Sequence, residues 1–363
     1  MAFKLPEYQV PDFVLSPSSK APSIRTAVVE TDGVAPDGYH ALSIFPEYFK
    51  VGEKWILPAE SRMDCVAVLR KSPGGAPEID IVEFRRLKCG DEVVLGRSED
   101  GSEGIYVDGS AFAETKSNDL FAFRGSRSRE TAYSRDYDEL YELLAHEREH
   151  GYIVWVLGPA VSFDYDSRRG MAQLIEKGYV HALLAGNALA THDLEGALLK
   201  TALGQDIYTQ ESKPNGHYHH LDLINLTRRH GSLEKLIERE DLQDGIIHAA
   251  VKKGIPLVLA GSIRDDGPLP GVYGDVYAAQ DAMRVHTRKA TTLVALATQL
   301  HTIATGNMTP AYTVKEGRVR PVYLYSVDVS EFAVNKLKDR GTLSAIPIVA
   351  NVQDFLVHLK NNL

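Results

Sequence analysis

Residues 257–270 read LVLAGSIRDDGPLP, the pattern of a short buried strand that ends in a polar loop. Residues 257–260 are all apolar. The residues that follow are small or charged: Gly261, Ser262, Arg264, Asp265 and Asp266. The Gly-Pro pair at 267–268 excludes regular structure beyond them. Open α/β sheets bind ligands in the crevice at the carboxyl ends of their strands, so we expect a ligand site here rather than a solvated surface loop.

The same pattern, an apolar run that ends in polar or turn-forming residues, recurs in three other stretches. These are 151–159 (GYIVWVLGP), 179–187 (YVHALLAGN) and 322–328 (VYLYSVD). Each is too short for a helix and rich in Val, Ile, Leu or Tyr, which is typical of a buried strand. A further run, 293–300 (LVALATQL), fits either a central strand or a buried helix.

Helical patterns lie around and between these runs. They cover residues 136–150, 167–177, 188–200, 233–239, 244–253 and 275–289. Alternating strands and helices predict an α/β fold, with a parallel sheet that carries helices on both faces. We expect this α/β domain to span residues 136–363.

The N-terminal third has a different pattern. Residues 1–23 contain four prolines and predict an extended arm that is disordered or lies on another subunit. Residues 24–113 contain short β-like runs separated by Gly, Pro and Asp, which predict a small, mostly antiparallel domain for packing and oligomerisation. Residues 114–135 are polar and predict a linker.

Composition excludes several classes of protein. With 44% hydrophobic and 25% charged residues, the chain resembles a soluble globular enzyme. A net charge of −9 argues against nucleic-acid binding. Two cysteines are too few for a disulfide framework or a structural zinc site. No apolar stretch has the length of a membrane span, and the N-terminus lacks a signal-peptide pattern, so we expect a cytoplasmic protein without membrane partners.

Polar residues after the second apolar run suggest chemistry. Asn187 ends the strand pattern, and His192, Asp193 and Glu195 follow on the predicted helix. A helix cap with a core histidine explains these residues about as well as an active site does. The loop after Gly158 and Pro159 is not G-x-G-x-x-G, so the usual dinucleotide fingerprint is absent.

Three histidines crowd residues 216–221 (GHYHHL). No short-spaced Cys or carboxylate completes a metal shell, so we predict no metal site. A hydrogen bond from His217 or His220 to a substrate is the preferred interpretation. Asp328 follows the last strong strand pattern, where an acid can accept hydrogen bonds from ribose hydroxyls. Lys336 is either a catalytic or substrate-binding lysine or a surface residue.

Several long motifs carry a resemblance to a known family. They are GPAVSFDYDSRRG, GYVHALLAGNALATHDLE, GHYHHLDLIN, LAGSIRDDGPLP, ATQLHTIATGN and NKLKDRG, in this order. The chain resembles the LOR/SDH conserved-domain family over about residues 120–363, and more loosely before them. Members include archaeal NAD-dependent ornithine cyclodeaminases and the C-terminal domain of cyanobacterial arginine dihydrolase/ornithine cyclodeaminases. The resemblance implies a deoxyhypusine-synthase-like NAD-binding fold, bound NAD and a homo-oligomer, either a dimer or a tetramer.

The chain departs from the family pattern at positions beside the expected pocket. Residues 201–205 read TALGQ where GTSLG is expected, and Asn335 stands where a Thr is expected. Tyr325, Ser326 and Val327 precede Asp328 in place of the more usual VCVD, and Asp164 lies close to an expected His. These changes bear on substrate identity more than on cofactor use.

Motifs and resemblance together predict an NAD-dependent cyclodeaminase. It would convert ornithine, or a close basic amino acid, to proline or a cyclic imino acid and ammonia, with NAD recycled in the site. The expected catalytic residues are His192 or Asp193 as base, Arg264 for the substrate carboxylate, Asp265 or Asp266 for the distal ammonium, and Lys336. The expected cofactor contacts are Gly158, Pro159, Gly186, Asn187, Gly261, Ser262, His301, Gly306, Asn307, Asp328, Asp339, Arg340 and Gly341.

Two other functions fit the same residues. One is an opine- or saccharopine-like NAD(P)-dependent dehydrogenase, which would consume free cofactor. The other is a protein that binds NAD or an amino acid without turnover. Net consumption of NADH separates the first alternative from a cyclodeaminase, and ligand binding without any product would indicate the second.

Overall fold

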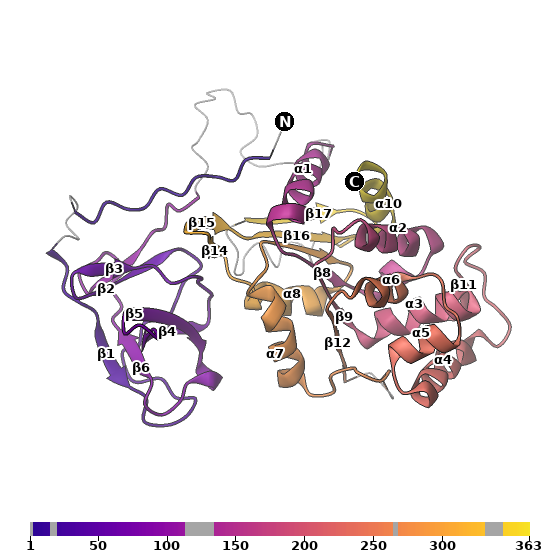
Figure 1. The fold of residues 1–363 in the computed structure, drawn as a ribbon, viewed down its shortest axis with the longest axis horizontal. Helices are drawn as coiled ribbons and strands as arrows, with labels where there is room; N and C mark the ends of the chain where they lie inside the picture. The colour runs from indigo at the N-terminus through magenta and orange to yellow at the C-terminus, as the bar shows by residue number, and fades with distance from the viewer. Residues whose placement is uncertain (1–2, 15–19, 113–133, 264–267, 331–343) are drawn as a thin grey trace.

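A six-stranded sheet organises the larger part of the molecule (Figure 1). The computed structural model describes residues 3–14, 20–112, 134–263, 268–330 and 344–363. Within the sheet, every neighbouring pair of strands is parallel, which confirms the predicted fold class. In spatial order, the strands are β12 (Leu257–Ala260), β9 (Ala182–Gly186), β8 (Ile153–Leu157), β13 (Thr292–Leu296), β16 (Tyr323–Asp328) and β17 (Ser344–Val349).

The strand order creates a switch point in the middle of the sheet. From β8 the chain builds outward through β9 and β12, and then returns to the other side of β8 to build outward through β13, β16 and β17. Numbered along the chain, this is the order 3-2-1-4-5-6 of dinucleotide-binding sheets. The crossovers that follow β8 and β13 therefore leave in opposite directions, and the carboxyl ends of these two strands are where sheets of this order form their ligand-binding crevice.

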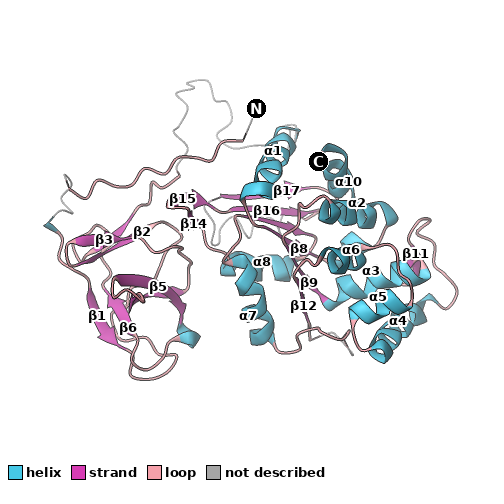
Figure 2. Ribbon diagram, viewed as in Figure 1, coloured by secondary structure: helices cyan, strands magenta, loops and turns pink. Residues whose placement is uncertain are grey.

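Helices cover both faces of the sheet, as predicted (Figure 2). Trp155 and Leu157 face one layer, and Val154 and Val156 face the other. Burial on both sides explains why these strands are near-continuous apolar runs. The first layer contains α1 (Ser134–His150), α2 (Tyr165–Glu176), α3 (Asn187–Leu199), α6 (Ile246–Lys253) and α10 (Val352–Asn362); the second contains α7 (Val276–Thr287) and α8 (Gln299–Met308).

The ambiguous run at 293–300 is resolved by its neighbours. Residues 292–296 pair with β8 on one side and β16 on the other, so the apolar run is a central strand. Helix α8 begins only at Gln299. In the described part of the chain, no helix combines the length and apolar character that crossing a membrane requires.

Smaller elements complete the α/β region. A 3-10 turn, η3 (Pro159–Ser162), links β8 to α2. Helices α4 (Gly216–His230) and α5 (Leu233–Arg239) pack beyond α3, and α4 carries the three clustered histidines. Two antiparallel hairpins are formed by β10 (Thr201–Ala202) with β11 (Gln205–Asp206), and by β14 (Tyr312–Lys315) with β15 (Arg318–Pro321).

The N-terminal module, residues 25–107, is antiparallel, as predicted. One sheet has the order β1-β6-β4-β5 and the other β3-β2-β7. Their bounds are β1 (Arg25–Val28), β2 (Glu47–Val51), β3 (Lys54–Ile56), β4 (Cys65–Lys71), β5 (Pro77–Glu83), β6 (Glu92–Leu95) and β7 (Ile105–Val107), and the 3-10 turn η2 (Phe84–Arg86) follows β5. Phe49 and Ile105 of the second sheet pack against alternate residues of β4, β5 and β6 of the first, and a valine-rich cluster packs on the other face of the first sheet.

The N-terminal arm packs on its own chain. The ring of Phe3 lies 5.4 Å from that of His146 on α1 and 6.0 Å from that of Tyr323 on β16. Phe13 stacks on Trp55 of the N-terminal module at 4.5 Å. Aromatic contacts therefore hold these arm residues against their own chain, and a contact of the arm with another subunit stays a prediction.

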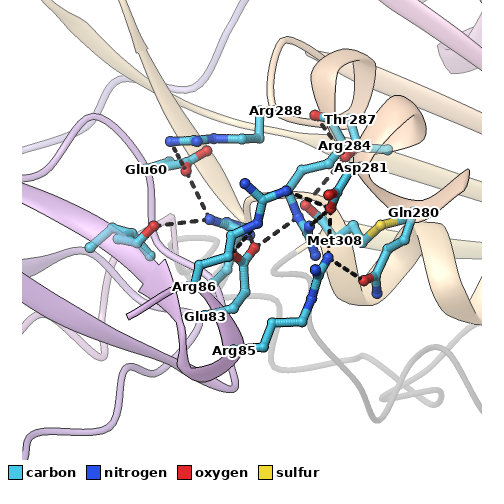
Figure 3. Close-up of polar contacts among 12 residues, drawn as sticks. Glu60, Glu83, Arg85, Arg86, Gln280, Asp281, Arg284, Thr287, Arg288 and Met308 are labelled. Carbon is cyan, nitrogen blue, oxygen red and sulfur yellow. Dashed lines mark hydrogen bonds and ion pairs between the residues drawn. The ribbon is translucent and has the colours of Figure 1, made fainter. Parts of the chain in front are cut away.

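Charged side chains join the N-terminal module to α7 (Figure 3). Glu83, at the end of β5, contacts Arg62 of the module and lies 2.8 Å from Nε of Arg284 on α7. The carboxylate of Asp281 on α7 forms ion pairs with Arg85 at 2.6 Å and with Arg86 at 2.5 Å. Burial raises the pKa of Glu83, but Arg62 and Arg284 more than offset it, so the pKa lies below the ordinary value of 4.5. Glu83 is therefore ionised and links the module to α7.

Replacing Glu83 tests this junction. Glu83→Gln removes the carboxylate shared by Arg62 and Arg284, which are only 2% and 8% exposed and keep one further acidic partner each, Glu60 and Asp281. We expect the free energy of unfolding to fall by about 3 kcal/mol at pH 7. Because the folded-state pKa of Glu83 is depressed, the difference is present above about pH 4.5 and disappears as pH falls through the folded pKa. Urea titrations at several pH values measure this difference in the free energy of unfolding.

Glu149→Gln, which removes an exposed partner of Arg148, is the control and should change the free energy of unfolding little. Equal effects of the two variants would contradict the assignment.

Candidate functional site

The switch point accepts only glycine at position 158. The N–H of Gly158 donates to the carbonyl of Leu296 at 2.8 Å, which draws the loop after β8 against the end of β13. A Cβ on Gly158 would lie 1.9 Å from the carbonyl oxygen of Ala297. Ala297 itself adopts φ +48, an uncommon conformation for a residue with a side chain. The two backbones therefore touch, and the chain turns sharply where the crevice begins.

Helix α3 starts beside this point without a side-chain cap. Its N-cap residue is Gly186, and no acidic residue occupies its first turn. A Cβ on Gly186 would lie 3.0 Å from Cε1 of His301, which reaches across from α8. Helix α2, in contrast, is capped by Asp164, whose carboxylate accepts the N–H groups of Asp166 and Ser167. Of these two helices, α3 is the one whose N-terminal N–H groups suit an anionic ligand.

Side chains tie neighbouring loops to this edge. Oδ1 of Asn187, the first residue of α3, accepts the N–H of Leu269 at 3.0 Å and so fixes the chain that returns after β12. Burial lowers the pKa of His301 below 6.5, so this ring is neutral at pH 7. Three predicted cofactor contacts, Gly186, Asn187 and His301, thus lie together.

His192 lies in the second turn of α3 and is 8% exposed. Its ring is 5.8 Å from that of Phe163, which follows η3, and 6.3 Å from that of His220 on α4. Its Nδ1 lies 2.9 Å from Oε2 of Glu195. The structure therefore brings together two histidines that the sequence analysis assigned to the site, between the segments that follow β8 and β9.

Glu195 is fully buried and makes several hydrogen bonds. Besides His192, its carboxylate accepts the hydroxyl of Thr201 at 2.8 Å and the N–H groups of Leu203 at 3.2 Å and Gly204 at 3.0 Å. Burial raises the pKa of Glu195, but the hydrogen bonds from His192, Gly204 and Thr201 bring it below the ordinary value of 4.5. Glu195 is therefore an ionised, acceptor-only group at neutral pH.

Asp193 faces a different side of α3. Its Oδ1 accepts Nε of Arg168 at 2.9 Å, and its Oδ2 accepts the N–H of Ile247, at the start of α6, at 2.8 Å. Arg168 is 1% exposed and Asp193 is 0% exposed. The carboxylate is thus held in a buried ion pair that joins α2, α3 and α6.

The remaining predicted residues are dispersed. His217 is exposed on α4, with its ring 4.3 Å from that of Tyr218. Gly306 and Asn307 lie near the far end of α8, about 12 Å along the helix from its start. Pro159 begins η3, Gly261 and Ser262 follow β12, and Oδ1 of Asp328 accepts the N–H of Ser330 at 2.8 Å. Arg264, Asp265, Asp266, Lys336, Asp339, Arg340 and Gly341 lie outside the described residues.

The sequence analysis named Glu195 without assigning it a role, and it missed Arg168. The His192–Glu195 contact has an i, i+3 spacing on a predicted helix, which is a detectable signal. No such signal in the sequence indicated Arg168, because its partner lies 25 positions away.

Two cavities in the described structure lie away from the strand ends. One, of about 340 Å³, lies between α2 and α6, and the other, of about 970 Å³, lies between the arm, α1 and the turn after β14.

Comparison with known proteins places the chain in a family. Residues 139–359 match the family of the arginine dihydrolase ArgZ-like C-terminal Rossmann fold. An ornithine cyclodeaminase of Methanocaldococcus jannaschii is 37% identical over 343 residues, which cover 92% of this chain and 76% of that protein.

Solved structures support the same family assignment. A crystal structure of a LOR/SDH protein from Methanococcus maripaludis has a TM-score of 0.83 and 34% identity, with coverage of 94% of this chain and 98% of that chain. A ternary complex of AgrE with ornithine and NAD+ has a TM-score of 0.58 and 32% identity, and it aligns with 94% of this chain and 46% of the AgrE chain. The chain therefore belongs to the family of the ArgZ-like C-terminal Rossmann fold.

Proposed function

We propose that this protein is an NAD-dependent cyclodeaminase that converts ornithine to proline and ammonia. The observation that carries the proposal is the glycine-only switch point at Gly158 in a 3-2-1-4-5-6 sheet, the position at which such sheets bind dinucleotides. Relatives that are ornithine cyclodeaminases, and a related structure that binds ornithine with NAD+, support this choice of reaction. The homo-oligomer and the cytoplasmic location stay predictions from the sequence.

The described residues suit NAD. Gly158 and Gly186 let the ends of β8 and β9 approach Ala297 and His301 more closely than any residue with a side chain would allow. The uncapped N-terminus of α3 provides N–H groups for a pyrophosphate, and Asp328 provides a carboxylate at the end of β16. Bound NAD supplies the hydride acceptor and donor that an internally balanced deamination and ring closure needs.

The geometry favours His192 over Asp193 as the proton acceptor. Both oxygens of Asp193 already accept hydrogen bonds, from Arg168 and from the start of α6. In His192, only Nδ1 has a hydrogen-bond partner among the described residues, so Nε2 is available. His220, close to the His192 ring, is the proposed substrate contact. From the sequence, Arg264 is proposed to bind the substrate carboxylate and Asp265 or Asp266 the distal ammonium.

Cofactor and product analysis tests the function. The purified protein should bind NAD, and incubation with ornithine should release ammonia and proline without net consumption of NADH, because hydride is returned in each turnover. Mass spectrometry of the product and absorbance of the cofactor measure both. Net oxidation of NADH with a keto-acid substrate would favour a dehydrogenase instead. Protein that neither contains a nicotinamide cofactor nor shows a thermal shift with NAD or NADP would exclude the proposal.

Gly186→Ala tests the cofactor crevice. The added methyl group lies 3.0 Å from Cε1 of His301 and fills space beside the start of α3. We expect NAD affinity to fall about tenfold, equivalent to about 1.4 kcal/mol, measured by titration. Gly109→Ala, where a Cβ meets nothing within 4 Å, is the matched control. Unchanged NAD affinity in Gly186→Ala would place the cofactor elsewhere.

Asp193→Asn separates a structural role from a catalytic one. The change leaves the buried guanidinium of Arg168 without its full counter-charge, so the free energy of unfolding should fall by about 3–5 kcal/mol. Chemical denaturation measures it. Asp244→Asn, which removes the half-exposed partner of Arg168 at 3.5 Å, should cost much less. A stable Asp193→Asn protein that has lost turnover would instead make Asp193 the base.

A further inference from the structure

We propose that Glu195 is a positioning residue that fixes one tautomer of His192 and presents its Nε2 as the proton acceptor for the substrate amine. The inference rests on the proposed function and assigns the proton chemistry within it. It is carried by the hydrogen bonds around the buried Glu195 carboxylate, whose donors together determine where each proton lies.

The tautomer of His192 follows from counting donors. Oε2 of Glu195 meets Nδ1 of His192 at 2.9 Å and the N–H of Leu203 at 3.2 Å. The other oxygen, Oε1, accepts the hydroxyl of Thr201 and the N–H of Gly204. An ionised carboxylate only accepts hydrogen bonds, so Nδ1 of His192 must carry the proton. In the neutral ring, Nε2 then holds a lone pair.

The same count of hydrogen-bond donors also assigns a proton on His219. The hydroxyl of Thr201 has a single proton, which it donates to Glu195. Nδ1 of His219, at 2.7 Å from this hydroxyl oxygen, must therefore be the donor in its contact with Thr201. Glu195 thus receives donors from α3, from β10 and from the turn after β10, so neither the carboxylate nor the His192 ring is free to rotate.

The arrangement suits proton transfer from an ammonium group. An N–H bond of the substrate breaks, a bond from the proton to Nε2 of His192 forms, and the ring becomes a cation beside the Glu195 carboxylate. The carboxylate stabilises that charge and takes no proton itself, the role of the third group in a base–orienter pair. The other titratable rings facing this pair are His220 at 6.3 Å and, through Thr201, His219.

The test combines spectroscopy with kinetics on the full chain. In ¹⁵N spectra of the wild type at neutral pH, we expect the His192 signals, assigned through their loss in His192→Gln, to show the Nδ1–H tautomer. Glu195→Gln places an amide where a carboxylate accepted donors. It should lose the single tautomer and reduce kcat about 10²- to 10⁴-fold, the usual contribution of a general base. KM for ornithine and the content of bound NAD should stay unchanged.

A buried pair elsewhere gives the matched control. His40 and Glu47 in the N-terminal module make the same type of contact at 2.7 Å and are also buried. Glu47→Gln should lower stability as Glu195→Gln does, and keep kcat within about twofold of the wild type. A similar loss of kcat in both variants would overturn the positioning role.

The outcomes separate this inference from the function on which it rests. An Nε2–H tautomer of His192 in an active wild type overturns the role of Glu195 alone. No turnover of ornithine by the wild type overturns the proposed function, and the role of His192 with it. The wild-type spectrum decides the tautomer even if Glu195→Gln fails to fold.

Discussion

The contact between Gly158 and Ala297 sets the geometry on which the rest of the site depends. The carbonyl of Ala297 occupies the place where any other residue at 158 would carry its Cβ, 1.9 Å away. Ala297 adopts a left-handed backbone conformation at φ +48, which costs about 1–2 kcal/mol of strain. Such strain is found where function needs an unusual backbone. Here it lets two crossovers separate at a single point, and the crevice opens there.

Helix α3 is anchored beside the switch point through carboxylates on two of its sides. Asp193 and Glu195 are two residues apart, which is about 200° around a helix, so their carboxylates face different neighbours. Asp193 joins the helix to α2 and α6 through Arg168 and the N–H of Ile247. Glu195 joins it to the hairpin that begins at Thr201. Since the helix is buried nearly all round, each carboxylate needs internal partners, and Glu195, fixed by its partners, in turn holds His192 in place.

Local patterns in the sequence predicted the strands well. Apolar runs that end in Gly-Pro, Gly-Asn, Gly-Ser or Asp identified β8, β9, β12 and β16, because each strand is buried on both faces. The run that became β13 stayed ambiguous until its two neighbours were known. Strand β17 and helix α10 were not anticipated. Side-chain partners were harder to predict: nothing in the spacing of Arg168 and Asp193 shows that they meet, so the proposal of Asp193 as a base was made without its buried ion pair in view.

The N-terminal module also contributes to the order of the site, although it lies at one side of the molecule (Figure 1). Its arginines and Glu83 hold the part of α7 around Asp281 and Arg284. Helix α7 packs against β12, and the chain between them passes Leu269, whose N–H binds Asn187 at the start of α3. A displaced module would therefore tilt α7 and disturb the loop that borders the crevice. Packed interiors transmit such shifts because they leave few voids to absorb them, so the ionic junction and the site are parts of one structure.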